Sequence, residues 1–221
     1  MNAVGASGRR EGASRVLSLT FDDGPDATWT PLIVEQLATC EARGTFFMVG
    51  ERILAEPALA RAVLAAGHDI QLHCHRHVRH TELSEQRLQL DAEEGIAALA
   101  GVGMRPRLWR APWGICTDAS VSVANRLGLR LVGWAIDTHD WRGDPVQAML
   151  AHAQARLADG GAVLMHDALG PGARRSGCQN TIELLPALVA AARERGLALG
   201  PMQHDLQDDP PAVEHASEVL V

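Results

Sequence analysis

The sequence predicts an α/β protein in which helices enclose a parallel sheet. Short apolar runs alternate with amphipathic segments along most of the chain, and the connections between them are short. Repeated strand–helix units of this kind place the strands parallel in one sheet, with the helices outside it. About seven units can be distinguished, which favours a barrel over an open, doubly wound sheet.

The first half of the chain contains three predicted strands and three predicted helices. The strands are residues 16–21, 45–49 and 68–72, and the helices are residues 31–42, 57–66 and 84–100. Thr30 is expected to cap the first helix, with Pro31 in its first turn. Gly67 ends the second helix, and Ser84 caps the third.

The second half repeats the pattern, and no linker divides it into two domains. The predicted strands are residues 108–110, 130–134, 162–165 and 197–199, and the helices are residues 118–127, 145–158 and 182–195. One domain over residues 15–201 accounts for all of these elements. The flanking segments, residues 1–14 and the acidic residues 202–221, are predicted to be poorly ordered tails.

Composition excludes several classes of protein. The chain has 221 residues, and 20 Arg without any Lys, set against 27 Asp and Glu, give a formal net charge of 20 − 27 = −7. With 47% apolar and 21% charged residues, neither a disordered nor a fibrous protein fits. No apolar run approaches the roughly 20 residues needed to cross a bilayer. A negative charge without a Lys-rich tract argues against a nucleic-acid partner.

The expected location is the cytoplasm. The first fifteen residues lack the apolar stretch of a secretory signal peptide. The four cysteines are widely and irregularly spaced, without a C-x-x-C pair, which is typical of reduced thiols. We therefore expect neither a disulfide framework nor a cysteine-based metal site.

Titratable residues follow five of the predicted strands at the same end. In a parallel α/β fold, functional side chains collect at the carboxyl ends of the strands. Five such coincidences predict one shared site at the mouth of the barrel. The residues are Asp22 and Asp23, His73 and His77, Arg110, Asp137 and Asp140, and His166 and Asp167.

Asp22 and Asp23 are adjacent, so their side chains point to different sides of the chain. One carboxylate can then bind a metal ion while the other accepts a proton. Their adjacency excludes the Asp-x-Asp motif of phosphatases. The residues alone leave a second interpretation open, because Asp-Gly-Pro is also a common turn sequence.

His73 and His77 are four residues apart, a spacing that places two side chains on one face of a helix. Two such imidazoles can bind zinc, with Asp as a further ligand. The alternation of His73, His75 and His77 is also the extended H-x-H pattern of amidohydrolase barrels, although there the pair is expected after the first strand rather than the third. A solvated histidine-rich loop is a third interpretation.

Five segments carry these residues: TFDDGP (20–25), HCHRH (73–77), RAPWG (110–114), DTHDW (137–141) and LMHD (164–167). In this order they resemble the motifs of the NodB-like polysaccharide deacetylases, carbohydrate esterase family 4. The resemblance covers residues 15–201. It implies a distorted, seven-stranded (β/α) barrel of the NodB-homology type and a hydrolase that removes an N-acetyl group from a sugar.

The resemblance also implies a metal centre and a general base. Asp23, His73 and His77 would hold one divalent metal ion, with Zn²⁺ favoured over Co²⁺ or Ni²⁺. Asp22 would take the proton as water attacks the N-acetyl carbonyl, and Arg110 would pair with Asp22 and fix its orientation.

The other implied residues supply an acid and the walls of a pocket. His166 would protonate the departing amine, with Asp140 as its charged partner. The backbone N–H of Trp113 would donate to the oxyanion. Trp141 and Leu164 would enclose the acetyl methyl group.

The sequence departs from the family pattern at three positions. Trp113 stands where Tyr is usual, Cys74 where Ser or Thr is usual, and Leu72 where Asn is common. Since the implied donor at position 113 is a backbone N–H, the chemistry is expected to survive while the surface that contacts substrate, Pro112 and Trp113, changes. Cys74 is expected to be a buried thiol rather than a ligand.

The expected substrate is an N-acetylated amino sugar in a soluble oligosaccharide or a glycosylated small molecule. Arg174 and Arg175 follow His166 in a glycine-rich segment, either as solvated loop charges or as partners of a carboxylate or phosphate on the substrate. Hydrolysis of a non-sugar amide or imide at the same metal site is the alternative reaction. An inactive binding module is the remaining alternative.

Overall fold

The computed structural model describes residues 16–157 and 161–202. Residues 1–14, predicted as a tail, lie outside the described residues, as do residues 203–221 of the second predicted tail. Met202, the first residue of that tail, is described, and its backbone N–H donates a 2.9 Å hydrogen bond to Thr45 Oγ1. No helix in the described ranges is both long and apolar enough to span a membrane.

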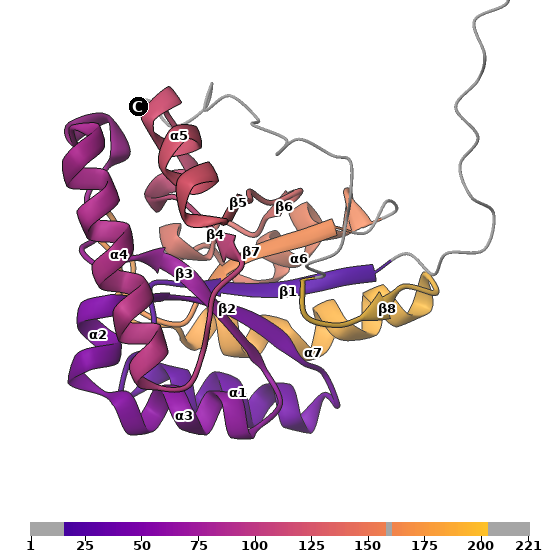
Figure 1. The fold of residues 1–221 in the computed structure, drawn as a ribbon. Coiled ribbons are helices and arrows are strands. Elements are labelled where there is room, and N and C mark those ends of the chain that lie inside the picture. Colours follow the sequence, from indigo (N-terminus) through magenta and orange to yellow (C-terminus); the bar gives the residue numbers. More distant parts are fainter. Residues whose placement is uncertain (1–15, 158–160, 203–221) are drawn as a thin grey trace, which may run out of the picture.

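A single parallel sheet forms the centre of the molecule, and it curls into a half-barrel with helices outside (Figure 1). Its seven main strands lie in the order β5-β4-β3-β2-β1-β7-β6, and the short β8 pairs with the start of β1. The predicted seven-stranded, distorted barrel is therefore confirmed. The strands are β1 (Val16–Asp22), β2 (Gly44–Val49), β3 (Asp69–Cys74), β4 (Leu108–Trp109), β5 (Arg130–Leu131), β6 (Ile136–Asp137), β7 (Gly161–His166) and β8 (Ala198–Leu199).

The register between β1 and its neighbours brings distant motifs together. Asp22, the last residue of β1, pairs with Phe47 of β2 on one side and with His166 of β7 on the other. Because parallel strands in register end at one edge of the sheet, residues that are 144 positions apart in the sequence become neighbours. This edge carries the predicted site.

The prediction of one strand over residues 130–134 was wrong. The chain forms two strands of two residues each: β5 pairs with β4, whereas β6 pairs with β7 at the opposite end of the sheet. The backbone N–H of Val132 still donates to Trp109, but that of Ala135 donates to Ala162. Residues 132–135 therefore cross from one edge of the curled sheet to the other, and this crossing interrupts the strand.

Seven α-helices in the described ranges surround the sheet, with α1, α3 and α7 packed along one side and α4 and α5 lying together on another (Figure 1). The short α2 was not predicted, since six residues give little periodicity. The helices are α1 (Trp29–Thr39), α2 (Gly50–Ala55), α3 (Pro57–Ala65), α4 (Glu85–Gly101), α5 (Asp118–Leu127), α6 (Val146–Gln154) and α7 (Gln179–Glu194).

The helix ends confirm one predicted cap and correct another. Ser84 Oγ accepts a hydrogen bond from the N–H of Arg87 at the start of α4, as predicted. Helix α1 begins at Trp29 rather than after Thr30, and Asp26 Oδ1 accepts from the backbone N–H groups of Thr28 and Trp29. Thr30 is inside the helix, where its hydroxyl is free to make a tertiary contact.

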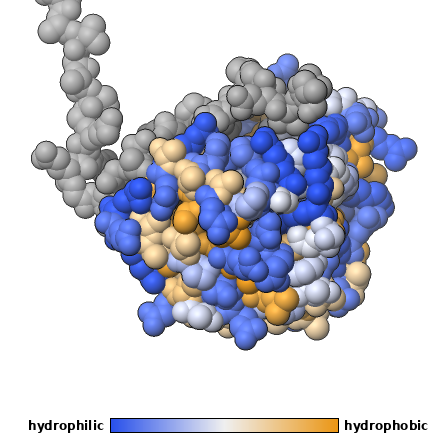
Figure 2. Space-filling view, turned by 180° about the vertical axis from the view of Figure 1, so that it is seen from behind, coloured by the Kyte–Doolittle hydropathy of each residue, from blue (hydrophilic) through white to orange (hydrophobic). Residues whose placement is uncertain are grey.

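The apolar core lies between the sheet and the helices. Phe21 of β1 stacks on Phe46 of β2, with ring centroids 4.9 Å apart, and both rings are fully buried. Leu184 and Leu188 of α7 are also fully buried in the same core. The face seen in Figure 2 is largely hydrophilic, with hydrophobic residues in smaller areas between polar ones. The core thus fixes the strands, and the residues at their carboxyl ends are available to form a site.

Candidate active site

A cavity of about 500 Å³ lies at the carboxyl ends of the strands. Its volume is within the range of roughly 300–1,000 Å³ that is usual for small-molecule sites. Most of the predicted site residues line it: Asp22, Asp23, His73, His77, Trp113, Trp141, Leu164, His166, Arg174 and Arg175. The other three, Arg110, Pro112 and Asp140, are buried.

Asp23, His73 and His77 form a compact cluster at one end of this cavity. His73 is in strand β3 and His77 follows that strand in a loop, so the predicted helical face was wrong. The chain turns after β3 and brings His77 close to His73 and Asp23. Asp23 Oδ1 lies 3.0 Å from His77 Nε2 and 3.4 Å from His73 Nε2, and one ligand atom from each residue lies within 4.8 Å of the other two.

The donor set of this cluster fits a divalent metal ion. His73 Nδ1 lies 2.9 Å from the carbonyl oxygen of Arg110; because a carbonyl only accepts, Nδ1 carries the proton and Nε2 keeps its lone pair. Asp23 Oδ1 and His77 Nδ1 are buried and have no hydrogen-bond partner among the described residues. A buried carboxylate oxygen beside two imidazole nitrogens is a ligand set that zinc accepts.

Electrostatics keep the Asp23 carboxyl ionised. Burial by itself would raise its pKa, but the neighbouring imidazoles of His73 and His77, together with the charge of His166, outweigh burial and hold the pKa well below its ordinary value. Ionised carboxylate is the form that binds metal. Cys74 is buried, its thiol pKa is raised well above the ordinary value by burial, and it is not part of the cluster, as predicted.

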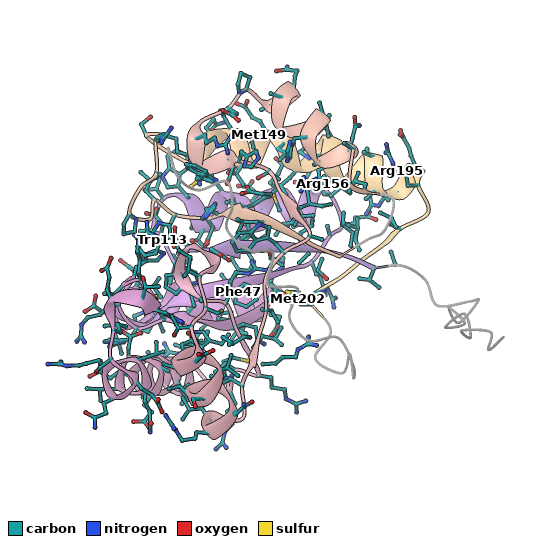
Figure 3. All side chains as sticks on the ribbon, turned by 90° about the horizontal axis from the view of Figure 1, so that it is seen from above. Phe47, Trp113, Met149, Arg156, Arg195 and Met202 are labelled. Atoms are coloured by element: carbon teal, nitrogen blue, oxygen red, sulfur yellow. The ribbon has the colours of Figure 1, made fainter. Side chains whose placement is uncertain are left out.

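Asp22 is held by a fully buried arginine. Arg110 Nη1 donates to Asp22 Oδ1 at 2.9 Å and to Thr20 Oγ1 at 2.7 Å, while Nη2 donates to the carbonyl of Gly133 at 2.8 Å. The guanidinium also lies 4.1 Å from the centre of the Phe47 ring. Phe47 and Met202, which both contact Arg110, lie close together in Figure 3. The predicted orientation of Asp22 by Arg110 therefore has a rigid structural basis.

His166 and Asp140 form a second pair, in which Asp140 is fully buried and the side chain of His166 is 16% exposed. His166 Nδ1 lies 2.8 Å from Asp140 Oδ1, and the backbone N–H of His166 donates to Asp140 Oδ2 at 2.9 Å. Burial lowers the pKa of His166, but the attraction of Asp140 dominates and raises it to about 9. Burial likewise raises the pKa of Asp140, yet His166 and Arg175 bring it down to about 2. An imidazolium paired with a carboxylate results.

Arg175 differs from what the sequence predicted. Its side chain is only 4% exposed, so it is not a solvated loop charge. Nη1 donates to Asp140 Oδ2 at 2.9 Å and to Thr181 Oγ1 at 2.6 Å, and Nη2 donates to the His166 carbonyl at 3.2 Å. Although Arg175 lines the cavity, both of its Nη groups donate within the protein, and its Nε is buried. Arg174 is exposed, which agrees with both interpretations of this residue, a solvated loop charge or a partner of the substrate.

Backbone conformation adds a second sign of a functional site. Asp23, Trp113 and His139 have φ values of 77°, 55° and 58°, in the left-handed region that costs a non-glycine residue roughly 1–2 kcal/mol. Asp23 belongs to the ligand cluster, Trp113 carries the predicted oxyanion donor, and His139 precedes Asp140. Such strain persists where the surrounding structure fixes it. A fourth such residue in the described ranges, Glu41, follows α1 and does not line the cavity.

Asp167 supports the turn that carries Asp23. Its carboxylate accepts hydrogen bonds from Thr30 Oγ1 at 2.6 Å and from the backbone N–H of Gly24 at 3.1 Å. Burial raises the pKa of Asp167 to about 7. The residue is fully buried and is not among those that line the cavity.

Three tryptophans line the cavity, and one of them was missed by the sequence analysis. Trp113, labelled in Figure 3, and Trp141 were predicted; Trp134 was not, since it was assigned to the end of the predicted strand 130–134. The sequence feature that could have indicated Trp134 is its position directly after Gly133, where the predicted strand 130–134 is interrupted. Trp29, the first residue of α1, is not among the residues that line the cavity.

The fold and this site define an α/β protein in which a carboxylate held by an arginine and an imidazole held by a carboxylate lie beside a cluster that fits a metal ion. The sequence profile described as polysaccharide deacetylase matches residues 9–132. The chain belongs to this family, the family 4 carbohydrate esterases, which are hydrolases of amide bonds.

Two curated relatives and one solved structure show the extent of the similarity. A peptidoglycan-N-acetylglucosamine deacetylase of Bacillus cereus is 34% identical over 155 residues, 69% of this chain and 73% of that protein. A chitooligosaccharide deacetylase of Bradyrhizobium sp. is 31% identical over 200 residues, 86% of this chain and 90% of that protein. The structure of a family 4 carbohydrate esterase from Streptomyces lividans in complex with acetate has a TM-score of 0.79 at 29% identity, covering 88% of this chain and 96% of that one.

Proposed function

We propose that this protein is a metal-dependent hydrolase that removes an N-acetyl or similar acyl group from an amino sugar in a soluble oligosaccharide or glycosylated small molecule. One observation carries the proposal. Asp22 and His166 are register partners on β1 and β7, each is held by an ion pair with a fully buried residue, and both line the cavity that contains the ligand cluster. Amide hydrolysis requires a base and an acid placed in this way.

Asp23, His73 and His77 would hold the metal ion through Oδ1 and the two Nε2 atoms. A divalent ion bound there supplies Lewis-acid polarisation of the acyl carbonyl and lowers the pKa of a water molecule. Zn²⁺ suits the mixed nitrogen and oxygen ligand set, and Co²⁺ or Ni²⁺ can be accommodated by the same residues.

Asp22 accepts the proton of the attacking water. Its carboxylate has one oxygen fixed by Arg110, which leaves the other oxygen as the acceptor. The water oxygen forms a bond to the acyl carbon while Asp22 takes the proton, so general-base catalysis contributes roughly 10²–10⁴-fold. The backbone N–H of Trp113 is assigned to the developing oxyanion.

His166 completes the reaction by donating a proton to the nitrogen as the C–N bond breaks. Asp140 binds Nδ1, so Nε2 is the ring nitrogen that donates. Because the pKa of His166 is raised to about 9, the imidazole is protonated at neutral pH and can serve as the acid. The products are a carboxylic acid and a free amine on the sugar.

The chemistry of the cavity walls supports an amino sugar as substrate. Trp113, Trp134 and Trp141 offer apolar ring surfaces, and Leu164 supplies an aliphatic surface for an acetyl methyl group. Two relatives reported above are named for N-acetylglucosamine units of peptidoglycan and for chitooligosaccharides. These names support an N-acetylated amino sugar, and the chitooligosaccharide name also supports a soluble oligosaccharide.

Acetate release tests the proposal. The purified protein, loaded with Zn²⁺, Co²⁺ or Ni²⁺ in turn, is incubated with N-acetylglucosamine oligomers and with a panel of non-sugar amides and imides. Acetate from the sugars, lost on chelation and restored by metal, is the expected result. Turnover confined to non-sugar amides would replace the substrate assignment, and metal-independent turnover would contradict the proposed metal centre.

A further inference from the structure

Two arginines flank one tryptophan at the cavity. The guanidinium carbons of Arg142 and Arg174 lie 5.0 and 5.8 Å from the centre of the Trp141 ring, and both arginines are exposed and line the cavity. The backbone N–H of Arg174 donates to the Trp141 carbonyl at 2.8 Å, which ties the two segments together. Two cations are thus held beside one aromatic surface.

The carboxylates that line the cavity do not neutralise these two arginines. Asp22 is paired with Arg110, and Asp137 lies 3.2 Å from His139. Asp23 belongs to the ligand cluster. Within the described ranges, the ion pairs found at 4.0 Å or less include none that involves Arg142 or Arg174.

Two cations beside the same ring repel each other, and an anion that contacts both would be attracted by each. The chain as a whole has a net charge of −7, so the local excess of positive charge is opposite to the overall balance. Guanidinium groups bind carboxylate and phosphate oxygens in a forked geometry that ammonium groups lack. A sugar ring against Trp141 would place its substituents within reach of both arginines.

We propose that Arg142 and Arg174 bind an anionic group, a carboxylate or a phosphate, on the substrate that the cavity accepts. The inference rests on the proposed function and further specifies that the substrate carries a negative charge. It also corrects the pair expected from the sequence: Nη1 of Arg175 is engaged by Asp140 and Thr181 and its side chain is only 4% exposed, so Arg142 takes its place.

The test compares three forms of tri-N-acetylated chitotriose that differ only at the reducing end: the neutral alditol, the aldonic acid and the 1-phosphate. With wild-type protein we expect the KM for an anionic form to be roughly tenfold lower than that for the alditol, as two partly exposed charge pairs allow. The difference should shrink as salt is added, because exposed charges are screened. Whichever anionic form has the lower KM identifies the preferred oxyanion.

The double variant Arg142→Gln with Arg174→Gln should lose this preference. Its KM for the anionic forms should rise roughly tenfold more than its KM for the alditol, since a contact that binds substrate and transition state equally appears in KM. Arg87→Gln is the matched control, because Arg87 is exposed on α4 and is absent from the cavity lining. This control should behave as wild type.

A binding measurement separates the two proposals. Calorimetry with the Asp22→Asn variant compares the aldonic acid with the alditol without turnover, so anion recognition is measured even if no acetate is released. Equal affinities, or equal loss of both in the double variant, would overturn the inference. Preferred binding of the anion without acetate release from wild-type protein would uphold anion recognition and contradict the proposed reaction.

Discussion

Arg175 and His166 contact the same buried carboxylate from its two oxygens. Arg175 Nη1 lies 2.9 Å from Asp140 Oδ2, and His166 Nδ1 lies 2.8 Å from Asp140 Oδ1. Asp140 is fully buried, and Thr181 donates a further hydrogen bond to Oδ2 at 2.7 Å. Both oxygens of the carboxylate are therefore hydrogen-bonded. Arg175 holds Asp140 in place, and Asp140 in turn fixes the orientation of the His166 ring.

Arg175→Met is expected to destabilise the fold. It leaves the carboxylate of Asp140 without its second cation, and breaking a buried pair by removing one partner costs about 3–5 kcal/mol. Urea denaturation followed by circular dichroism measures the change. Arg174→Met is a close control, because the neighbouring residue is the same type but exposed, and its effect should stay within about 0.5 kcal/mol. Similar effects of the two substitutions would show that Arg175 is not the counter-ion of Asp140.

The strand pattern predicted that titratable residues would gather at one edge of the sheet, and the family resemblance implied the ligand set and the pairs Asp22–Arg110 and His166–Asp140. Neither indicated the role of Arg175. Asp23, His73 and His166 each lie at the carboxyl end of an apolar strand or directly after it, so their meeting at one edge follows from parallel topology. Arg174 and Arg175 are identical neighbours in one loop. Only the position of Asp140 in the folded structure explains why Arg175 is buried while Arg174 is exposed.

The separation of β5 from β6 could not be predicted from the sequence either. Each of these strands has two residues, too few for a periodic pattern, and the intervening residues 132–135 include the apolar Val132 and Trp134. The crossing between the two sheet edges has a function of its own. It supplies the Gly133 carbonyl that binds Arg110 and the Trp134 ring that lines the cavity.

Asp140→Asn is expected to move the alkaline limb of the pH–rate profile. The acid must be protonated to act, so with a His166 pKa of about 9 the wild-type rate falls as the pH rises through about 9. Without the Asp140 charge, burial dominates and the pKa of His166 falls toward or below its ordinary value of about 6.5. The limb should therefore shift to lower pH in kcat measured across pH 6–10.

The matched control for this profile is Asp137→Asn. It removes a carboxylate that also lines the cavity, but one that pairs with His139 rather than with His166. The alkaline limb should move much less in this variant. An alkaline limb that stays in place in Asp140→Asn would rule out His166 as the group whose ionisation sets it.

Asp22→Asn and Asp23→Asn should separate the base from the ligand. The two residues are adjacent, yet Asp22 pairs with Arg110 while Asp23 belongs to the ligand cluster. Asp22→Asn is expected to lower kcat by roughly 10²–10⁴-fold with metal content retained. Asp23→Asn should lose bound metal together with activity, and excess metal should restore part of it. Elemental analysis beside kinetics measures both, and loss of metal from the Asp22 variant would contradict this division.

Gly170→Ala tests whether the space beside Asp23 sets metal affinity. A Cβ at position 170 would lie 2.0 Å from Asp23 Oδ2, so the carboxylate must move. Disturbing the orientation of a ligand typically costs roughly 10–100-fold in metal affinity. We expect weaker metal binding in titrations, and activity that returns at high metal concentration. Gly101→Ala, in α4 with open space around its Cβ position, is the control and should bind metal as wild type does. Equal affinities in both variants would mean that Asp23 does not ligate the ion in this geometry.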